Sequence, residues 1–374
     1  MVNIKINYRE GSMNNLRLLV LDNIEELGKS VNENLKKMNK IKSDFIIPIK
    51  RDRFSNGEGK VSIEGTVRDK DIYILSDVGN YALTYEMHGL THYLGPDEHF
   101  QDIKRVIAAI SGYASKITVV MPLLYESRQH RRKGRESLDC AIALQELERL
   151  GVNHIVTFDV HDPNVCNAIP NLPFENFFVA HEILKEYIQN EDAKDIDNTI
   201  VVSPDMGAME RARYFAEMLN LDVGVFYKRR DLSVVVNGKN PIVEHVYLGR
   251  DVKGNNTIIV DDIIASGNSI LEVAKDLKER GAKKVYLVAT FPLFTEGVDV
   301  FIKAYEEGIF DKLYTTNLTY VPESIKKEAW FQSVDMSKKI SKIINTMHKQ
   351  ASLSPLFNGK DEILKLLDEK KNGK

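Results

Sequence analysis

Two adjacent carboxylates, Asp261 and Asp262, stand where an apolar stretch of the chain meets a turn of small residues. The residues before them are apolar or β-branched, which predicts a strand. The turn spans 265–269, and apolar residues then recur at helical spacing. Ser269 and Glu272 have the spacing of a capping box, so we expect the helix to begin within the turn. The sequence therefore predicts strand, turn and helix, with two acids at the junction.

This junction combines two kinds of binding chemistry. The unpaired backbone N–H groups and the positive dipole end of a helix N-terminus favour phosphate. Two carboxylates beside a phosphate repel it unless they bind a cation or accept hydrogen bonds from hydroxyl groups. A sugar phosphate bound with a divalent cation satisfies both requirements. For the acid pair alone, two solvated acids at a strand end are the simpler interpretation, but the strand before it and the turn after it favour a binding site.

Further candidates follow two other expected strands. The segment 128–135 holds five cations within eight residues and follows the expected strand 117–121. His161 stands beside acids after the expected strand 155–159. Loops at the carboxyl ends of parallel strands suit polyphosphate, because arginine forks bind phosphate oxygens bidentately. A solvated basic patch and a structural histidine are the corresponding alternatives.

Size and composition narrow the classes of function. With 374 residues, two domains are expected, and 43% hydrophobic with 28% charged residues is typical of a globular protein. A net charge of -3 offers no basic excess for nucleic acid or membrane partners. No apolar run reaches the roughly 18 residues that span a bilayer, and no signal-peptide core is present, so we expect a cytoplasmic protein. Cys140 and Cys166 are expected to be small buried hydrophobes.

Helical and strand patterns alternate along the chain, which predicts an α/β fold. Residues 81–100 interrupt the alternation with three histidines, His88, His92 and His99. Their spacing lacks a cysteine or a carboxylate cluster, so a solvated loop is preferred to a metal site. Residues 191–198 are charged and are expected to be exposed.

Over about residues 44–357 the chain resembles the ribose-phosphate diphosphokinases, which make phosphoribosyl pyrophosphate and are related to type I phosphoribosyltransferases. Five motifs occur in the family's order. They are Phe54–Glu58 (family Phe-Ser-Asp-Gly-Glu), Tyr125–Arg131 (Tyr-x-Arg-Gln-Asp-Arg, with one extra residue), Asp159–His161 (Asp-Leu-His), Val202–Gly207 (Val-Ser-Pro-Asp-x-Gly) and Lys228–Arg230 (Lys-Arg-Arg).

The resemblance implies an α/β fold of two phosphoribosyltransferase-like (type I) domains, each a mainly parallel sheet flanked by helices. The N-terminal domain, 1–180, would carry the ATP-binding loops. The C-terminal domain, 181–357, would carry the ribose-5-phosphate loop, and 358–374 is a charged extension without counterpart in the family.

The implied reaction transfers the pyrophosphoryl group of Mg-ATP to the 1-hydroxyl of ribose 5-phosphate, giving 5-phosphoribosyl 1-pyrophosphate and AMP. The implied catalytic residues are Lys228, Arg230 and His161. The implied Mg²⁺ ligands are His161 and Asp205. The implied ATP-binding residues are Phe54, Asn56, Glu58, Arg128, Gln129 and Arg131. The implied ribose-5-phosphate-binding residues are Asp205, Asp261, Asp262, Ser266, Gly267, Asn268 and Ser269.

The resemblance also implies a dimer-based homo-oligomer, such as a hexamer, in which the Phe54 loop reaches a neighbouring subunit. Asn56, His130, Ala265 and Phe291 depart from the family's residues. Two alternatives therefore stay open. One is a catalytically weak regulatory paralogue that binds an active partner subunit, and the other is a phosphoribosyltransferase that consumes the product. A nucleic-acid-binding module ranks last.

Overall fold

The computed structural model describes residues 13–230 and 242–372, without the side chains of 228–230 and 242–245. The chain separates into two compact units. Unit 1 contains the chain up to Phe178 together with Leu318–Tyr320 and Asp335–Asn358. Unit 2 contains Val179–Asn317, Val321–Val334 and the chain from Gly359 onward. Residues 335–357, which we expected in the second domain, therefore belong to unit 1. None of the helices in the described ranges is long and apolar enough to cross a membrane.

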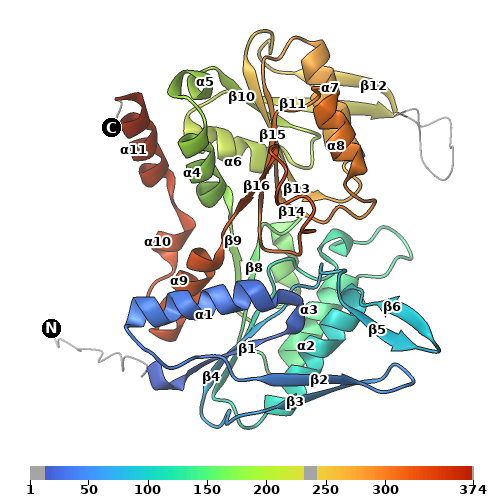
Figure 1. Cartoon of the computed structure of the whole chain (residues 1–374), viewed down its shortest axis with the longest axis vertical. Helices are drawn as coiled ribbons and strands as arrows, with labels where there is room; N and C mark the ends of the chain where they lie inside the picture. Colours follow the sequence, from blue (N-terminus) through green and yellow to red (C-terminus); the bar gives the residue numbers. More distant parts are fainter. Residues whose placement is uncertain (1–12, 231–241, 373–374) are drawn as a thin grey trace. The chain divides into compact units, whose positions relative to one another are not determined.

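The centre of unit 1 is a sheet of five parallel strands (Figure 1). Every residue of β4 is buried, as expected of a parallel strand covered on both faces. The strand order is β1 (Leu16–Val20), β4 (Asp71–Leu75), β7 (Lys116–Val120), β8 (His154–Phe158) and β9 (Phe174–Phe177).

Helices cover both faces of this sheet. The apolar residues of α2 (Pro96–Ile110) and α3 (Asp139–Arg149) form one core with alternate strand residues such as Ile72 and Ile74. Helix α9 (Ser337–His348) packs against α1 (Glu25–Asn39), where the Ser341 hydroxyl donates to the Val31 carbonyl at 3.1 Å. This packing is the reason that residues 335–358 belong to unit 1. The short helix α10 (Ser354–Phe357) follows.

Two hairpins extend from unit 1. Strands β2 (Ile49–Arg53) and β3 (Gly59–Ile63) form one, and β5 (Thr84–Met87) and β6 (Leu90–Tyr93) form the other. The expectation of a solvated loop at 81–100 is wrong, because this segment forms the second hairpin and the start of α2. His99 is fully buried, with its Nε2 2.6 Å from the Asn80 carbonyl oxygen.

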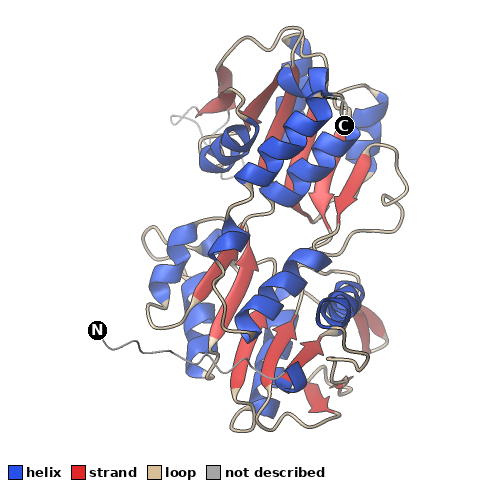
Figure 2. Ribbon diagram, turned by 90° about the vertical axis from the view of Figure 1, so that its left-hand side faces the viewer, coloured by secondary structure: helices blue, strands red, loops and turns tan. Residues whose placement is uncertain are grey.

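Unit 2 contains a seven-stranded sheet that is parallel except for the antiparallel pair β11 and β12. The strand order is β12 (Ile242–Leu248), β11 (Val223–Arg230), β10 (Thr199–Ser203), β13 (Asn256–Ile264), β14 (Val285–Pro292), β15 (Lys312–Thr316) and β16 (Phe331–Val334). Figure 2 shows helices packed over the faces of this sheet. The two mainly parallel sheets flanked by helices confirm the predicted fold class.

Helices cover both faces of the unit 2 sheet as well. Helices α7 (Asn268–Glu279) and α8 (Asp299–Glu306) share one apolar core with the strands. Helix α6 (Met209–Leu219) packs on β10 and β13, and α4 (Ala180–Asn190) on β15 and β16. The C-terminal helix α11 (Lys360–Lys371) packs on α4 through the buried residues Ile363 and Leu367.

Two smaller expectations are also corrected. Residues 191–198 are not uniformly exposed, because they include α5 (Ala193–Asp197) and the buried Glu191. Glu191 accepts hydrogen bonds from the hydroxyls of Tyr286 and Tyr314 inside unit 2. Cys140 is buried as expected, whereas Cys166 is only partly buried.

Candidate active site

The paired acids lie within β13, near its carboxyl end. The strand continues through both of them to Ile264 rather than ending before them. The Asp262 backbone N–H donates to the Asp261 carboxylate at 2.9 Å, and the Ile263 N–H donates to the Asp262 carboxylate at 3.0 Å. The backbone therefore holds both carboxylates at the place where the strand approaches the turn.

Burial makes this acid pair electrostatically unusual. Asp262 is 5% exposed, and the Arg211 guanidinium of α6 lies 3.6 Å from its carboxylate. Burial and the neighbouring Asp262 carboxylate raise the pKa of Asp261 to about 7, although Arg211 opposes the increase. A bound cation, or a hydroxyl group that donates a hydrogen bond, would favour the fully ionised form of the pair because it offsets the repulsion between the two carboxylates.

The turn after β13 presents backbone amides. Helix α7 begins at Asn268, which confirms a helix start within the turn. The N-cap is Gly267, which has no side chain to cap the helix, so the capping box expected from Ser269 and Glu272 is wrong. The Ser266 hydroxyl accepts the Asn268 N–H at 3.4 Å. The first intrahelical bond runs from the Leu271 N–H to the Gly267 carbonyl. The amides of the preceding residues therefore have no acceptor within the helix, as a phosphate-binding turn requires.

Gly267 is required in this turn for two reasons. Its φ of 83° lies in the left-handed region, which disfavours a side chain. A Cβ at this position would also lie 2.3 Å from the Phe301 ring of α8. The turn is thus fixed by backbone conformation and by packing against α8.

Two neighbouring strands end at the same edge of the unit 2 sheet. Strand β10 pairs in parallel with β13 and leads into the loop of Asp205. The exposed Asp205 accepts N–H groups from Gly207 at 2.8 Å and Ala208 at 3.1 Å. Strand β11 pairs in parallel with β10 and ends at Arg230. The side chains of Lys228 and Arg230 lie outside the described part of the structure.

In unit 1, His130 joins two of the predicted loops. Strands β7 and β8 are parallel neighbours, so the Arg128 loop and the His161 loop follow the same sheet edge. His130 Nε2 lies 3.2 Å from the Asp162 carboxylate, and its ring centroid lies 5.4 Å from that of His161. The Gln129 amide donates to the Ser137 carbonyl at 2.8 Å, which closes the first loop on itself. Sequence reasoning treated His130 only as a departure from the family, and missed this contact.

The predicted adenine-binding residues occupy the tip of the β2–β3 hairpin. Phe54 is 53% exposed, so it is not a hydrophobic plug beneath the loop. The Asn56 amide donates to the Glu58 carboxylate at 3.0 Å, and the Glu58 N–H donates to the Asn56 side chain at 3.2 Å. The loop thus presents an exposed aromatic ring next to a pair of interacting polar groups.

Asp102 of α2 anchors this hairpin and belongs to no predicted motif. It is fully buried, with its carboxylate 3.0 Å from Arg51 and 3.1 Å from Arg53, both in β2. Arg105 contacts the other carboxylate oxygen at 2.5 Å. The cluster joins α2 to a strand that lies far from it in the sequence, so no local sequence signal could identify it.

The two predicted metal ligands lie in different units, His161 in unit 1 and Asp205 in unit 2. Within the described residues, no three His, Cys, Asp or Glu side chains are grouped as a metal site. Asp205 nevertheless offers an exposed carboxylate, and Mg²⁺ binds through one or two carboxylates when phosphates and water supply its other ligands. The residues therefore suit an ion that arrives with a nucleotide.

The fold and the turn after β13 place the chain among phosphoribosyltransferase-type α/β proteins. Residues 16–151 match the model of the N-terminal domain of ribose phosphate pyrophosphokinase. Residues 228–358 match that of the phosphoribosyl synthetase-associated domain. A ribose-phosphate pyrophosphokinase of Shewanella oneidensis is 30% identical over 82% of this chain and 89% of its own length. The chain belongs to the ribose-phosphate pyrophosphokinase family.

Other members of this family are also similar to the chain. Ribose-phosphate pyrophosphokinase 2 of Schizosaccharomyces pombe is 28% identical over 82% of this chain and 88% of its own length. The ribose-phosphate pyrophosphokinase of Bacillus subtilis is 27% identical over the same shares. The crystal structure of phosphoribosylpyrophosphate synthetase from Mycobacterium smegmatis superimposes with a TM-score of 0.74 at 23% identity, covering 90% of this chain and 100% of that chain. This last similarity concerns the fold.

Proposed function

We propose that this protein transfers the pyrophosphoryl group of Mg-ATP to the 1-hydroxyl of ribose 5-phosphate, forming 5-phosphoribosyl 1-pyrophosphate and AMP. The observation that carries the proposal is the Asp261–Asp262 pair beside the glycine-started N-terminus of α7. One half of this arrangement suits sugar hydroxyls and the other suits a phosphate. Family membership supplies the reaction that uses such a ligand.

Unit 2 is proposed to bind ribose 5-phosphate. Asp261 and Asp262 would accept hydrogen bonds from the ribose hydroxyls, directly or through a metal ion. The amides and hydroxyls of residues 266–269 would bind the 5-phosphate, and Asp205 would bind from the neighbouring loop. A single turn can supply these phosphate contacts, because its amides all precede the first intrahelical bond of α7.

Unit 1 is proposed to bind ATP. Arg128, Gln129 and Arg131 would hold the phosphates, because guanidinium forks match phosphate oxygens. Phe54 would stack on adenine, and Asn56 and Glu58 would hydrogen-bond to the base. An amide at position 56 can still accept a hydrogen bond from the exocyclic amine.

In the proposed reaction the 1-hydroxyl oxygen attacks the β-phosphorus, and the bond from that phosphorus to the oxygen of the α-phosphate breaks. AMP leaves, and the hydroxyl proton is released. Lys228 and Arg230 would stabilise the charge on the β-phosphoryl and leaving oxygens, and His161 would act beside the nucleotide. Asp205 and His161 would hold Mg²⁺, which neutralises phosphate charge when bound.

The setting of the reaction is also a proposal. We place the enzyme in the cytoplasm as a dimer-based homo-oligomer. The exposed Phe54 supports an assembly in which the hairpin tip contacts a neighbouring subunit, because an aromatic ring gains from burial against a partner.

The test incubates the purified chain with Mg²⁺, ATP and ribose 5-phosphate, and follows AMP and phosphoribosyl pyrophosphate. Lys228→Ala should abolish product formation, whereas the matched control Lys275→Ala, at an exposed position on α7, should retain it. Folded protein that binds ATP without forming product would overturn the proposal in favour of a regulatory paralogue. Consumption of phosphoribosyl pyrophosphate with a purine base would instead indicate a phosphoribosyltransferase.

A further inference from the structure

One face of the unit 1 sheet is polar at the amino ends of its strands. Asp71, Lys116 and His154 are the first residues of β4, β7 and β8. The parallel register pairs Asp71 with Lys116 and Thr118 with His154, so these side chains share one face. The buried strands of a parallel sheet are normally apolar, so a polar cluster on such a face requires an explanation.

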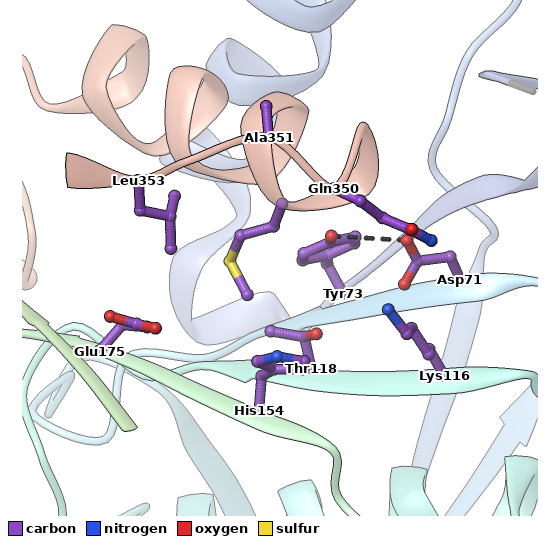
Figure 3. Close-up of a pocket in the computed structure, with 10 residues that line it drawn as sticks. Asp71, Tyr73, Lys116, Thr118, His154, Glu175, Gln350, Ala351 and Leu353 are labelled. Atoms are coloured by element: carbon purple, nitrogen blue, oxygen red, sulfur yellow. Dashed lines mark hydrogen bonds between the residues drawn. The ribbon is translucent and has the colours of Figure 1, made fainter. Parts of the chain in front are cut away.

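These residues line a cavity of about 330 Å³. Residues 347–353, which include the end of α9 and the segment after it, cover the polar face and complete the cavity wall (Figure 3). Glu175 of β9 lies at one end of the cavity, and Asp71 and Lys116 lie at the other (Figure 3). The predicted ATP loops follow the carboxyl ends of β7 and β8, whereas this cavity lies at the amino ends of the same strands. The cavity is therefore distinct from the proposed active site.

The acids of the cavity are incompletely paired. Asp71 Oδ2 lies 2.7 Å from His348 Nδ1 and accepts the Tyr73 hydroxyl at 3.5 Å. Asp71 Oδ1 is buried, and the described residues provide it with no hydrogen-bond donor. A buried acceptor without a donor is energetically costly, so a ligand that supplies a donor is stabilised by this contact.

Glu175 is the second acid that lines the cavity. Burial raises its pKa, and no ion pair to it occurs among the described residues. Lys116 is placed beside Asp71 by the register, and the pKa of His154 is lowered by burial and by Lys116, which favours the neutral imidazole. The cation Lys116 thus lies at the Asp71 end of the cavity, whereas Glu175 lies at the other end without a cationic partner among the described residues, so a cation bound there would favour the ionised form of Glu175 (Figure 3).

We propose that this cavity binds a small organic cation with several N–H donors, a primary amine or a guanidinium compound. The cationic group pairs with Glu175, and a further N–H group reaches the Asp71 carboxylate after a small side-chain adjustment. The two carboxylates disfavour phosphate and other anions. A metal ion is disfavoured because the acids and histidines here are not grouped as metal ligands within the described residues.

The experiment titrates the full-length protein with agmatine and with 1,4-diaminobutane by isothermal titration calorimetry at neutral pH. Both amines should bind saturably, whereas 1,4-butanediol, which lacks the charges, should not. Glu175→Gln should weaken binding about tenfold or more, because a charge-assisted hydrogen bond contributes roughly 1.5–3 kcal/mol. Glu64→Gln, at an exposed position of the same unit, should bind like the unaltered chain.

Circular dichroism would verify that Glu175→Gln folds, which is expected because the change removes an unpaired charge. The proposal would be overturned if the unaltered protein bound neither agmatine nor 1,4-diaminobutane saturably. It would also be overturned if the Glu175→Gln variant bound the amines as tightly as the unaltered protein. Competition between ATP and agmatine for one site would also overturn it, because binding would then occur at the nucleotide site. The result does not depend on whether the protein makes phosphoribosyl pyrophosphate.

Discussion

At the scale of single residues, the chemistry proposed for unit 2 rests on a pair of acids that are costly to keep together. Asp261 and Asp262 are adjacent, and burial raises the pKa of Asp261 to about 7. Arg211 at 3.6 Å offsets only part of the repulsion. Two carboxylates that repel each other in the empty site are stabilised when a ligand or cation binds to them. This is the physical basis for proposing that the pair binds substrate.

Replacing Asp261 with Asn tests this role. We expect kcat/KM for ribose 5-phosphate to fall roughly 100-fold, because one or two charged hydrogen bonds are lost. The free energy of unfolding should not decrease, since a buried repulsion is removed. Glu272→Gln is the matched control, because Glu272 is exposed on α7 and its predicted cap is absent, so its kinetics should be unchanged. Equal kinetics for the Asp261→Asn variant and the unaltered chain would exclude Asp261 from the site.

Asp77 predicts a pH dependence of stability in unit 1. Burial raises its pKa to about 7, although Gly79, Tyr320 and Thr319 donate hydrogen bonds to it. The folded state therefore binds this proton more tightly than the unfolded chain, whose aspartates have a pKa of about 3.9. The contribution of Asp77 to stability is highest below about pH 4 and falls as the pH rises to about 7.

Denaturant unfolding at pH 5 and pH 8 would measure this effect. The unaltered chain should lose free energy of unfolding between pH 5 and pH 8, whereas the Asp77→Asn variant should not lose this contribution. The free energy of unfolding of the variant minus that of the unaltered chain should therefore be larger at pH 8 than at pH 5. We expect the difference to reach at least about 1.4 kcal/mol, the equivalent of one pKa unit. A pH-independent difference between the two proteins would show that Asp77 does not titrate in this interval.

At the scale of elements, the turn before α7 depends on a helix that follows it in the sequence. Gly267 sets the start of α7, and Phe301 of α8 occupies the space where a side chain at position 267 would lie. The hairpin proposed to bind adenine shows the same dependence, because Asp102 of α2 holds Arg51 and Arg53 of β2 and so the hairpin that carries Phe54. Each binding loop is thus held by an element that contributes no predicted ligand.

Gly267→Ala should be more harmful than an alanine at an equally strained but open position. Gly297 has a φ of 87°, and no heavy atom lies within 4 Å of the place that a Cβ would occupy there. The free energy of unfolding of Gly297→Ala should therefore fall by about 1 kcal/mol, from backbone strain alone. Gly267→Ala adds the clash with Phe301, so its free energy of unfolding should fall by roughly a further 1–3 kcal/mol. Its affinity for ribose 5-phosphate should fall as well. Thermal unfolding and substrate titration of both variants would measure this, and equal losses would contradict the role of Phe301.

At the scale of the whole molecule, neither unit is a continuous stretch of chain. Unit 1 incorporates residues 335–358, and unit 2 resumes at Gly359. The apolar residues Val31 and Leu35 of α1 are fully buried, as are Ile343 and Ile344 of α9, which packs against α1. The two units are therefore connected by more than one crossing of the chain, and unit 1 is incomplete without the C-terminal segment.

A fragment that ends at residue 178 should accordingly be unstable. Without α9, the buried face of α1 would be exposed to water, and each large apolar side chain exposed costs about 1.5–3 kcal/mol. Joining residues 335–358 to this fragment through a flexible linker should restore a cooperative thermal transition, whereas the same segment with Ile343 and Ile344 changed to Ser should not. Cooperative unfolding of the short fragment at the same temperature as the joined one would refute the expectation.

The sequence by itself determined the features that neighbouring residues encode. Apolar periodicity predicted the α/β fold, and the turn after Asp262 predicted where α7 begins, because both depend on short-range backbone geometry. Only the tertiary structure decided which residues from distant segments of the chain contact one another. Examples are the contact of His130 with Asp162, the arginines around Asp102, the packing of residues 335–358 in unit 1 and the cavity at Glu175. The order of the strands sets these contacts, and no local pattern of residues specifies that order.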